Sequence, residues 1–455
     1  MASPDPSVTS SGGDVAVPHT FWQYLGSLGP GIVIALTWLG AGDLVDTAVA
    51  GGSYGYALMW AMALALFVRF VFVSIIAKYH LCNQHGESVL AGLKRIHPSV
   101  PILVGIIALF FGHFYGSFLV KGVGETTAKL LAPILPQLGA DWIWPMVWSA
   151  VWVIVAAAIV FRGLYGHIEK LFYVLLGVLT VSLIGVALWS GPNPAAALRG
   201  TFLFALPEQT GPFGAVLLVT SLIGAVGGSI ANLLYPYFIE QKGWRGPRFR
   251  RLQLYDLAFG TGVLIVLDLA VWTVGAELLH PRGIVIENLD DLAALLTEVL
   301  GRLGGIVFFM GVFAALYSSV IGNAIGYGYM LADLVNVCRS QHGRRTDESA
   351  ASPGALPASL AYRLTACWCL FSPLVWCLPN MPGFVTLTIV ANAAGVIVLP
   401  VLSASLWYIT ARKSLIGAAY CNRLWENLVM GALFLLALWG AFQSLRSIEQ
   451  ILFAA

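Results

Sequence analysis

The chain has 455 residues, of which 58% are hydrophobic and only 10% are charged, and it contains 15 Trp and 49 Gly. This composition lies far outside the soluble globular range and predicts an all-α protein that crosses a membrane many times. The net charge of +2 is too small to indicate nucleic-acid binding, and the six cysteines lack metal-ligand spacing. We therefore expect a lipid bilayer around the chain, with no nucleic acid, cofactor or partner protein.

Hydrophobic runs divide the chain into membrane spans. The first twenty residues carry no Lys or Arg and no apolar core, which predicts a disordered cytoplasmic tail without a cleaved signal peptide. A spanning helix needs about 20 apolar residues. Eleven runs of suitable length follow, at residues 28–51, 55–79, 101–123, 142–161, 168–190, 213–239, 254–279, 304–335, 358–379, 382–410 and 425–445.

The distribution of Lys and Arg predicts the orientation, because cytoplasmic loops carry an excess of these residues. Seventeen of the 24 Lys and Arg residues fall on one side, in the connections or at the ends of the spans, and six on the other, while Arg69 lies deep inside a span. The N-terminus is therefore predicted to be cytoplasmic and the C-terminus outside. We expect the plasma membrane, or the inner membrane of a prokaryotic cell, as the location.

Two connections between predicted spans have distinctive sequences. Residues 340–359 are polar, rich in small residues and punctuated by proline, which predicts a flexible cytoplasmic linker. Residues 286–303 place leucines at helical spacing against acidic residues. That pattern predicts an amphipathic helix, which either lies on the membrane surface or packs against the protein.

The first span contains the stretch Leu39-Gly40-Ala41-Gly42-Asp43-Leu44-Val45-Asp46-Thr47. A charge at bilayer depth costs at least about 2.5–3.5 kcal/mol on insertion scales, so such residues usually face a cavity and serve a function. Glycines beside Asp43 allow the helix to unwind and to offer carbonyl oxygens next to the carboxylate. The stretch predicts half of an ion site, where Asp46 either shares the cavity or caps the second half-helix through Thr47.

The sixth span contains a similar interruption, Ile223-Gly224-Ala225-Val226-Gly227-Gly228-Ser229, followed by Asn232 and Tyr235. Many transporters consist of inverted repeats whose first helices are broken at matching midplane positions. Two breaks five spans apart predict one five-helix repeat over 21–190, a second over 191–410 and an additional helix within 411–455. Glycines that merely permit close helix packing are the alternative explanation.

Several motifs carry a family resemblance. Gly29-Pro30-Gly31, the stretch 39–43, Ala50-Gly51-Gly52 and Leu58-Met59-Trp60 resemble the first-helix region of the NRAMP family of divalent-metal transporters, where GPG leads to a DPGN motif and a small-residue pair. Residues 318–326 and Leu399-Pro400 resemble its eighth and tenth helices. The resemblance covers about residues 20–445. It implies a leucine-transporter-like fold in which protons drive the uptake of manganese, iron or similar metals.

The resemblance also implies ion ligands, and some of them depart from the family pattern. The implied set comprises the side chains of Asp43, Ser229 and Asn392 and the backbone carbonyls of Gly40 and Val226. Gly40 stands where the family has the aspartate of its motif, and Ser229 where it has a methionine. Without that thioether the ligands are oxygens, which suit hard cations such as Mg²⁺, Mn²⁺, Ca²⁺ or Na⁺. We expect Asp46, Thr47, Asn232 and Tyr235 around this set.

Three further ionisable residues lie inside spans. His113 is either the proton carrier or a core histidine that is satisfied by its neighbours. Asp268 and Arg69 are expected to neutralise each other as a structural ion pair, with a proton or charge relay as the alternative.

The sequence thus predicts a secondary active transporter that moves a cation, in particular a divalent metal ion such as Mn²⁺ or Mg²⁺, by alternating access and with protons as a coupling ion. The alternative is a Na⁺-coupled or proton-coupled transporter of a small organic solute on the same fold. An enzyme is not expected, because the chain shows no nucleophile–base constellation and no metal-histidine cluster.

Overall fold

The computed structural model describes residues 41–135, 143–163, 165–208, 212–227, 229–339 and 359–453. Within these ranges the chain is helical and contains no strand. Ten helices in this part of the chain are long and apolar enough to cross a membrane, so the chain is a multi-pass membrane protein. The predicted tail over 1–20 and nearly all of the predicted linker over 340–359 lie outside the described residues.

The first half of the chain forms the helices expected from its hydrophobic runs. The described helices are α3 (Ala41–Tyr54), α4 (Met59–Cys82), α5 (Val89–Lys94), α6 (Ser99–Leu131), α7 (Ile143–Arg162), α8 (Tyr165–Trp189) and the short α9 (Pro194–Phe202). The second to fifth predicted spans correspond to α4, α6, α7 and α8. The first predicted span, 28–51, is described only from Ala41 onward, as α3.

The second half follows the same order. Its helices are α10 (Ala215–Leu222), α11 (Tyr235–Gln241), α12 (Arg250–Val274), α13 (Leu289–Arg339), α15 (Leu360–Phe371), α16 (Phe384–Gly395), α17 (Leu399–Ala411), α18 (Lys413–Ile416) and α19 (Leu424–Phe453). The predicted spans from the sixth to the eleventh correspond to these helices, with α10 and α11 sharing one span and α16 and α17 another.

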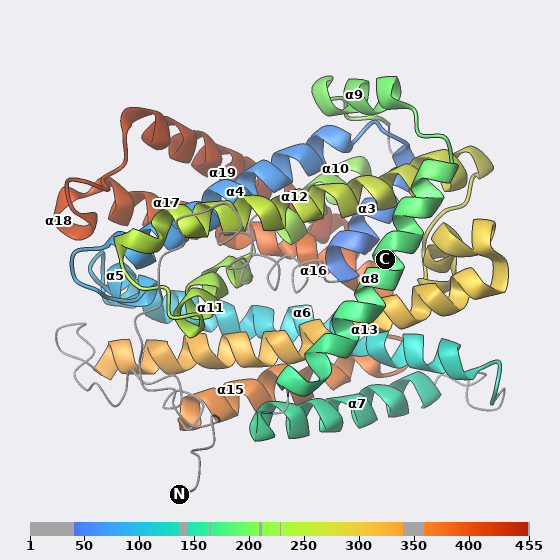
Figure 1. The fold of residues 1–455 in the computed structure, drawn as a ribbon, viewed down its shortest axis with the longest axis horizontal. Helices are drawn as coiled ribbons and strands as arrows, with labels where there is room; N and C mark the ends of the chain where they lie inside the picture. The colour runs from blue at the N-terminus through green and yellow to red at the C-terminus, as the bar shows by residue number, and fades with distance from the viewer. Residues whose placement is uncertain are drawn as a thin grey trace, which may run out of the picture.

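The helices form two packed groups (Figure 1). In one group α6 packs against α7, α13 and α15, and in the other α12 packs against α3 and α4. Helix α16 contacts both groups, through α6 on one side and through α3 and α10 on the other. Helix α8 likewise contacts α12 and α13. The interior between the two groups is therefore bordered by α3, α6, α10, α13 and α16.

The predicted break of the sixth span is confirmed. Helix α10 ends at Leu222 and is followed by a π-helical turn over Ile223–Gly227. Ser229 has extended backbone angles, φ −60° and ψ 144°, and begins a 3₁₀ turn over Ile230–Leu234 that leads into α11. The matching break predicted near Gly40 lies at the edge of the described residues, since α3 begins at Ala41.

Small residues allow the helices to approach closely around this break. A Cβ atom at Gly224 would lie 1.8 Å from the carbonyl oxygen of Asn392 on α16. A Cβ atom at Gly51 of α3 would lie 2.8 Å from the carbonyl oxygen of Trp272 on α12. Close backbone contact of this kind is how helices commonly pack in membranes. The glycines of α3 and of the broken sixth span therefore serve close helix packing as well as helix breaking.

The structure of helix α13 decides between the two alternatives predicted for residues 286–303. The helix bends at Gly301, which has φ 56° and ψ −140°. In the part before the bend, Leu289, Leu292 and Leu296 are buried. The apolar face therefore packs against the protein, which was the alternative to a helix on the membrane surface.

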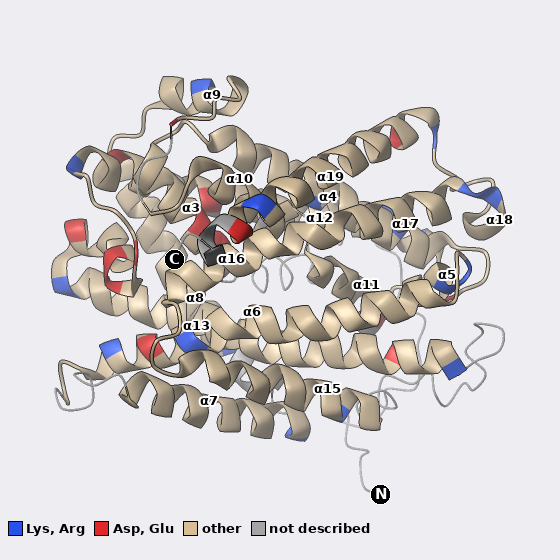
Figure 2. Ribbon diagram, turned by 180° about the vertical axis from the view of Figure 1, so that it is seen from behind, with Lys and Arg blue, Asp and Glu red and all other residues tan. Residues whose placement is uncertain are grey.

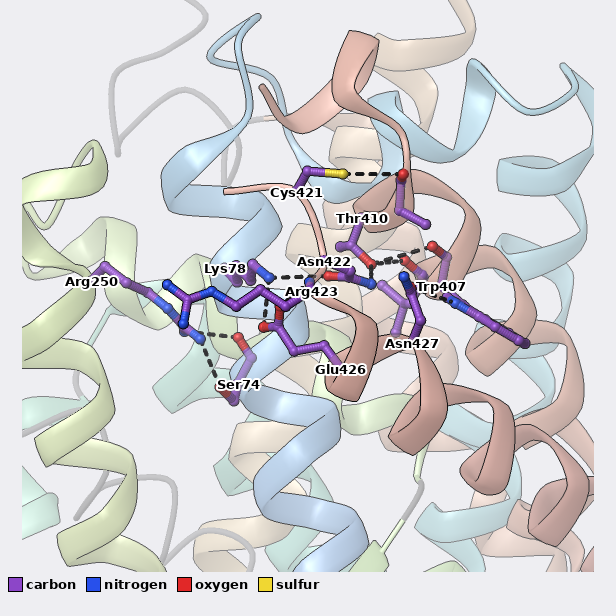
Figure 3. A network of polar contacts seen from close by, with 12 residues as sticks. Ser74, Lys78, Arg250, Trp407, Thr410, Cys421, Asn422, Arg423, Glu426 and Asn427 are labelled. Atoms are coloured by element: carbon purple, nitrogen blue, oxygen red, sulfur yellow. Dashed lines mark hydrogen bonds and ion pairs between the residues drawn. The ribbon is translucent and has the colours of Figure 1, made fainter. Parts of the chain in front are cut away.

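A polar network joins α4, α12, α17 and the start of α19 (Figure 3). The Lys78 ammonium group donates to Glu426 Oε1 at 2.7 Å and to Asn422 Oδ1 at 3.0 Å. One turn earlier in α4, Ser74 accepts two hydrogen bonds from Arg250, through its carbonyl and hydroxyl oxygens, both at 2.8 Å. We call these residues, together with Thr410, the α4–α19 network. It fixes one end of α4, the helix that carries Arg69.

Candidate functional site

A cavity of about 110 Å³ lies beside the break between α10 and α11. Figure 2 shows few charged positions along the middle of the helices, and a group of them lies beside α3. The cavity has polar and apolar walls from α3, α4, α6, α13, α16 and the broken sixth span. Its lining residues are Gly42, Asp43, Arg69, Tyr115, Phe118, Leu119, Ala225, Ser229, Ala231, Asn232, Leu234, Phe238, Ser319, Gly322, Asn323 and Asn392.

Asp43 and Arg69 form an ion pair in the wall of this cavity. Arg69 Nη1 donates to Asp43 Oδ2 at 3.1 Å, and Nη2 donates to the carbonyl oxygen of Ala225 at 2.7 Å. Both residues are buried, with exposed fractions of 3% for Asp43 and 2% for Arg69. The direct ion pair of Arg69 is with the carboxylate on α3, whereas Asp268, its predicted partner, interacts with it electrostatically.

Asp46 follows Asp43 by one helical turn and is fully buried. Asn392 Nδ2 donates to Asp46 Oδ2 at 2.9 Å, while Asp46 Oδ1 has no hydrogen-bond partner among the described residues. The Ser221 hydroxyl faces this carboxylate without reaching hydrogen-bond geometry. Asn392 also lies against Gly42, where a Cβ atom would approach its Nδ2 to 3.1 Å. Asn392 therefore links Asp46 to the cavity wall.

Asp268 on α12 is the third carboxylate of this region. It is 2% exposed, and its Oδ2 has no hydrogen-bond partner among the described residues. It interacts electrostatically with both Asp43 and Arg69. Thr47 is buried as well, and its hydroxyl has no partner in the described part of the chain.

Ser229 and Asn232 organise the break itself. Ser229 Oγ accepts a hydrogen bond from the Ala231 amide at 3.1 Å and donates to the Tyr115 hydroxyl at 3.3 Å. The first contact is an N-cap, which satisfies an orphan amide at the start of a helical segment. Asn232 Nδ2 donates to the carbonyl oxygen of Gly227 at 3.3 Å. Both side chains thus line the cavity and also stabilise the local backbone.

Five of the expected residues do not line the cavity, namely Asp46, Thr47, Asp268, Tyr235 and His113. The Tyr235 hydroxyl donates to Asp256 Oδ2 at 3.3 Å, on the side that faces α12. His113 Nε2 accepts from Trp376 Nε1 at 3.0 Å, and its Nδ1 lies 2.8 Å from Ser372 Oγ. With both ring nitrogens engaged, His113 has the contacts of the core histidine that was the alternative to a proton carrier.

Of the two backbone ligands implied by the resemblance, one lies outside the described residues and the other is partly described. Gly40 lies outside the described residues, and Val226 lies in the π-helical turn without a described side chain. The carbonyl oxygen that contacts a charged group in this turn is that of Ala225, one residue earlier.

Sequence reasoning missed three polar residues of the cavity wall, namely Tyr115 on α6 and Ser319 and Asn323 on α13. Ser319 Oγ donates to the carbonyl oxygen of Ala315 at 2.8 Å, and Asn323 Nδ2 donates to that of Gly112 at 3.2 Å. The four-residue spacing of Ser319 and Asn323 places both on one face of an apolar helix, and this pattern could have identified them as cavity residues.

The charges of the site do not cancel. Asp43, Asp46 and Asp268 carry three formal negative charges when ionised, against one positive charge on Arg69. Unpaired buried charges are costly, so the excess must be neutralised by protons or by a cation. Among the described residues, no three His, Cys, Asp or Glu side chains are arranged to hold a metal. Any ion held here would therefore also depend on carbonyl, amide and hydroxyl oxygens.

A sequence model described as "Natural resistance-associated macrophage protein-like" matches residues 31–445. The chain belongs to the Nramp family. It is therefore a membrane transporter and not an enzyme, as the sequence predicted. A curated relative, the divalent metal cation transporter MntH of Chromohalobacter salexigens, is 20% identical over 339 residues, which cover 70% of this chain and 72% of the relative.

Solved structures confirm the fold of this Nramp chain. The manganese transporter of Eremococcus coleocola, in complex with an aromatic bis-isothiourea compound, superposes with a TM-score of 0.73 at 15% identity, covering 97% of this chain and 90% of that one. MhsT in complex with L-phenylalanine gives a TM-score of 0.52 at 17% identity, with coverages of 91% and 98%. The predicted leucine-transporter-like arrangement is thereby confirmed.

Within this Nramp chain the ion ligands remain predictions. Of the predicted side-chain ligands, Asp43, Ser229 and Asn392 all line the cavity. Asp43 and Asn392, however, contact different partners, Arg69 and Asp46. The cavity therefore brings the predicted residues together, but with a guanidinium among them.

Proposed function

We propose that this chain is a secondary active transporter that moves a divalent cation, such as Mn²⁺ or Mg²⁺, across the plasma membrane by alternating access. Membership in the Nramp family supports this proposal. So do the names of its relatives, which include divalent metal cation transporters and a manganese transporter. The cation would enter and leave through the cavity between the two groups of helices, with the N-terminus cytoplasmic.

The excess of buried carboxyl groups over buried cationic groups is the observation that carries the proposal. Asp43, Asp46 and Asp268 are each at most 3% exposed, and Arg69 compensates only one of their charges. A single divalent cation would balance the remaining two charges. Because carboxylates at membrane depth are costly without a partner, Asp43 in the wall of the cavity, with Asp46 bound to the lining residue Asn392, favours a cationic substrate.

The ligand chemistry favours a hard cation. The groups beside the cavity are carboxylate, carbonyl, hydroxyl and amide oxygens, without a thioether or an imidazole among its described lining residues. Oxygen ligands suit Mg²⁺, Mn²⁺ and Ca²⁺ better than soft transition metals. The small cavity would leave a bound Mg²⁺ room for some of the water molecules that this ion sheds reluctantly.

Protons are the proposed coupling ion. Asp46 Oδ1 and Asp268 Oδ2 lack hydrogen-bond partners among the described residues, and each can carry a proton when no cation balances its charge. Arrival of a divalent cation would release these protons, so that cation and proton occupancy are linked. The transport direction of the protons then decides between symport and exchange.

A small organic solute is the second candidate substrate. Arg69 in the cavity wall is the observation that favours it, since guanidinium groups recognise carboxylates through paired hydrogen bonds. A solute carboxylate would compete with Asp43 for the guanidinium. A requirement for Na⁺ or protons together with the solute would distinguish this function from cation transport.

Flux into proteoliposomes tests the proposal directly. The purified chain is reconstituted, and uptake of Mn²⁺, Mg²⁺, Ca²⁺, Na⁺ and amino acids is measured with and without an inward proton gradient. We expect uptake of at least one divalent cation and a dependence of its rate on the gradient. Uptake of an amino acid, with no divalent cation moved and none competing, would refute cation transport in favour of the second candidate.

A matched variant makes the test specific to the cavity. Asp333 on α13 is a buried carboxylate that accepts a hydrogen bond from the Tyr237 hydroxyl at 3.0 Å, and it does not line the cavity. Asp333→Asn should leave cation flux per folded protein near the wild-type value. Equal losses of flux per folded protein in Asp333→Asn and Asp43→Asn would mean that loss of any buried carboxylate impairs transport, and would refute a specific role of Asp43 in the cavity.

A further inference from the structure

Arg69 occupies the oxygens that a hard cation would use. Its two terminal nitrogens bind Asp43 Oδ2 at 3.1 Å and the Ala225 carbonyl oxygen at 2.7 Å. One of these acceptors is a carboxylate of α3, and the other is a carbonyl within the π-helical turn of the sixth span. A carboxylate beside the carbonyl of a broken helix is the ligand combination expected for an ion in transporters of this architecture.

A guanidinium group remains charged under all physiological conditions. It therefore cannot yield Asp43 by losing its proton, and it must move if a second cation is to bind the same carboxylate oxygen. Both partners are nearly inaccessible to solvent, with side-chain exposures of 3% and 4%, so screening by water does not weaken their interaction.

We propose that Arg69 is a tethered cation that competes with the transported cation for Asp43 and the Ala225 carbonyl. This inference rests on the proposed cation transport and adds a residue that sets affinity and selectivity. Only a cation that binds these oxygens more strongly than the guanidinium enters the site. The returning guanidinium then helps to release the ion on the other side of the membrane.

Asp268 supplies the second position for the displaced guanidinium. Its carboxylate is buried on α12, interacts electrostatically with Arg69 and has an Oδ2 without a hydrogen-bond partner among the described residues. A swing of the Arg69 side chain from Asp43 to Asp268 would keep the guanidinium paired while it frees the carboxylate on α3. The two carboxylates thus define two end points of one side-chain movement.

Removal of the guanidinium should strengthen cation binding. Mn²⁺ and Mg²⁺ affinities are measured by calorimetry on purified wild type, Arg69→Ala and Arg69→Lys. We expect binding to Arg69→Ala to be on the order of ten- to a hundredfold tighter, the scale of one charge-assisted hydrogen bond. Arg69→Lys keeps the charge but loses the paired donors of the guanidinium, so its cation affinity should lie between those of wild type and Arg69→Ala.

Free guanidinium separates competition from a merely structural role of Arg69. In Arg69→Ala, guanidinium chloride at millimolar, non-denaturing concentrations should raise the melting temperature and weaken Mn²⁺ binding competitively. Urea, a neutral molecule of the same shape, should do neither, and wild type should respond to neither compound. Equal effects of guanidinium and urea, or unchanged Mn²⁺ affinity in Arg69→Ala, would overturn the proposal.

Asp268→Asn tests the second position. It should weaken cation binding in wild type, because the displaced guanidinium loses its acceptor, and it should have less effect in the Arg69→Ala background. Equal effects in both backgrounds would refute the movement to Asp268. A wild-type chain that moves no cation in the flux panel would instead refute the proposed function, while guanidinium stabilisation of Arg69→Ala would still report on the pairing with Asp43.

Discussion

Two of the groups of charged residues among the described helices differ in how completely their polar atoms are paired. In the α4–α19 network, Glu426 Oε1 accepts from Lys78 and Glu426 Oε2 accepts from the Arg423 amide at 2.7 Å (Figure 3). Beside the cavity, Asp46 and Asp268 each keep one oxygen without a hydrogen-bond partner among the described residues. No fully buried side-chain polar atom of the network lacks a hydrogen-bond partner, whereas two such oxygens of the cavity group do.

This difference separates a structural cluster from a functional one. Buried polar atoms are nearly always paired, so an unpaired carboxylate oxygen requires an explanation such as a proton, a water molecule or an ion. A saturated network instead rigidifies the helices that it joins. The α4–α19 network should therefore hold α4 in place, whereas the cavity group should exchange ions. Each prediction below tests one side of this comparison.

The largest effect is expected for Asp43→Asn. It removes the charge that pairs with Arg69 and leaves a buried guanidinium uncompensated, which costs about 3–5 kcal/mol of stability. Cation flux should fall to the background of empty liposomes, and Asp43→Ala should behave in the same way. Flux assays and thermal melts of the purified variants measure both effects.

The double variant Asp43→Asn/Arg69→Gln separates stability from transport. Removing both charges should restore much of the melting temperature, since neither partner is then left unpaired. Flux should remain lost, because the ion still lacks its carboxylate. Recovery of flux in the double variant would show that Asp43 serves only to neutralise Arg69.

Asn392→Ala should have the next largest effect. It deletes the donor to Asp46 Oδ2 and leaves that carboxylate without a described hydrogen-bond partner, at a cost of about 1–3 kcal/mol. We expect a loss of about tenfold in cation affinity, the equivalent of about 1.4 kcal/mol. The control is Asn422→Ala, which removes an amide of the network, and a similar affinity loss in this control would contradict the distinction between the two groups.

Much of the fold was predictable, because hydropathy alone decides where a chain can span a membrane. Ten helices of the described residues coincide with predicted spans, and the break at Ser229 follows from the glycines before it. The position of Asp43 beside a cavity was also predictable, because a carboxylate at that depth needs a polar environment.

The pairing of Arg69 could not be predicted from the sequence. Asp43 and Asp268 both lie within electrostatic reach of the guanidinium, and only the packing of α4 against the broken sixth span selects the first. The polar lining on α13 was hidden for a similar reason, since Ser319 and Asn323 sit in a motif whose polar residues also bond to helix backbone. Helix rotation, which the sequence does not specify, decides which side chains reach the cavity.

Lys78→Met tests the network side of the comparison. It removes the donor to Glu426 and Asn422, and we expect a stability loss of about 1–3 kcal/mol, the cost of leaving a partly buried charged acceptor without its partner. Cation affinity and flux per folded protein should stay near the wild-type values. A tenfold loss of affinity at unchanged melting temperature would show that the network takes part in ion movement.

The smallest effect is expected for Ser229→Ala. Ser229 makes a structural contact and also lines the cavity, so this variant tests whether one residue serves both roles. The substitution removes the cap on the Ala231 amide, at a cost of about 0.5–2 kcal/mol, and also a hydroxyl that lines the cavity. Ser88→Ala is the matched control, because Ser88 caps α5 through the Ala91 amide at 3.3 Å and lies outside the cavity. If Ser229 is an ion ligand, flux should fall severalfold in Ser229→Ala, recover in Ser229→Thr and remain unchanged in Ser88→Ala. Equal flux in the two alanine variants at equal loss of stability would assign Ser229 to the cap alone.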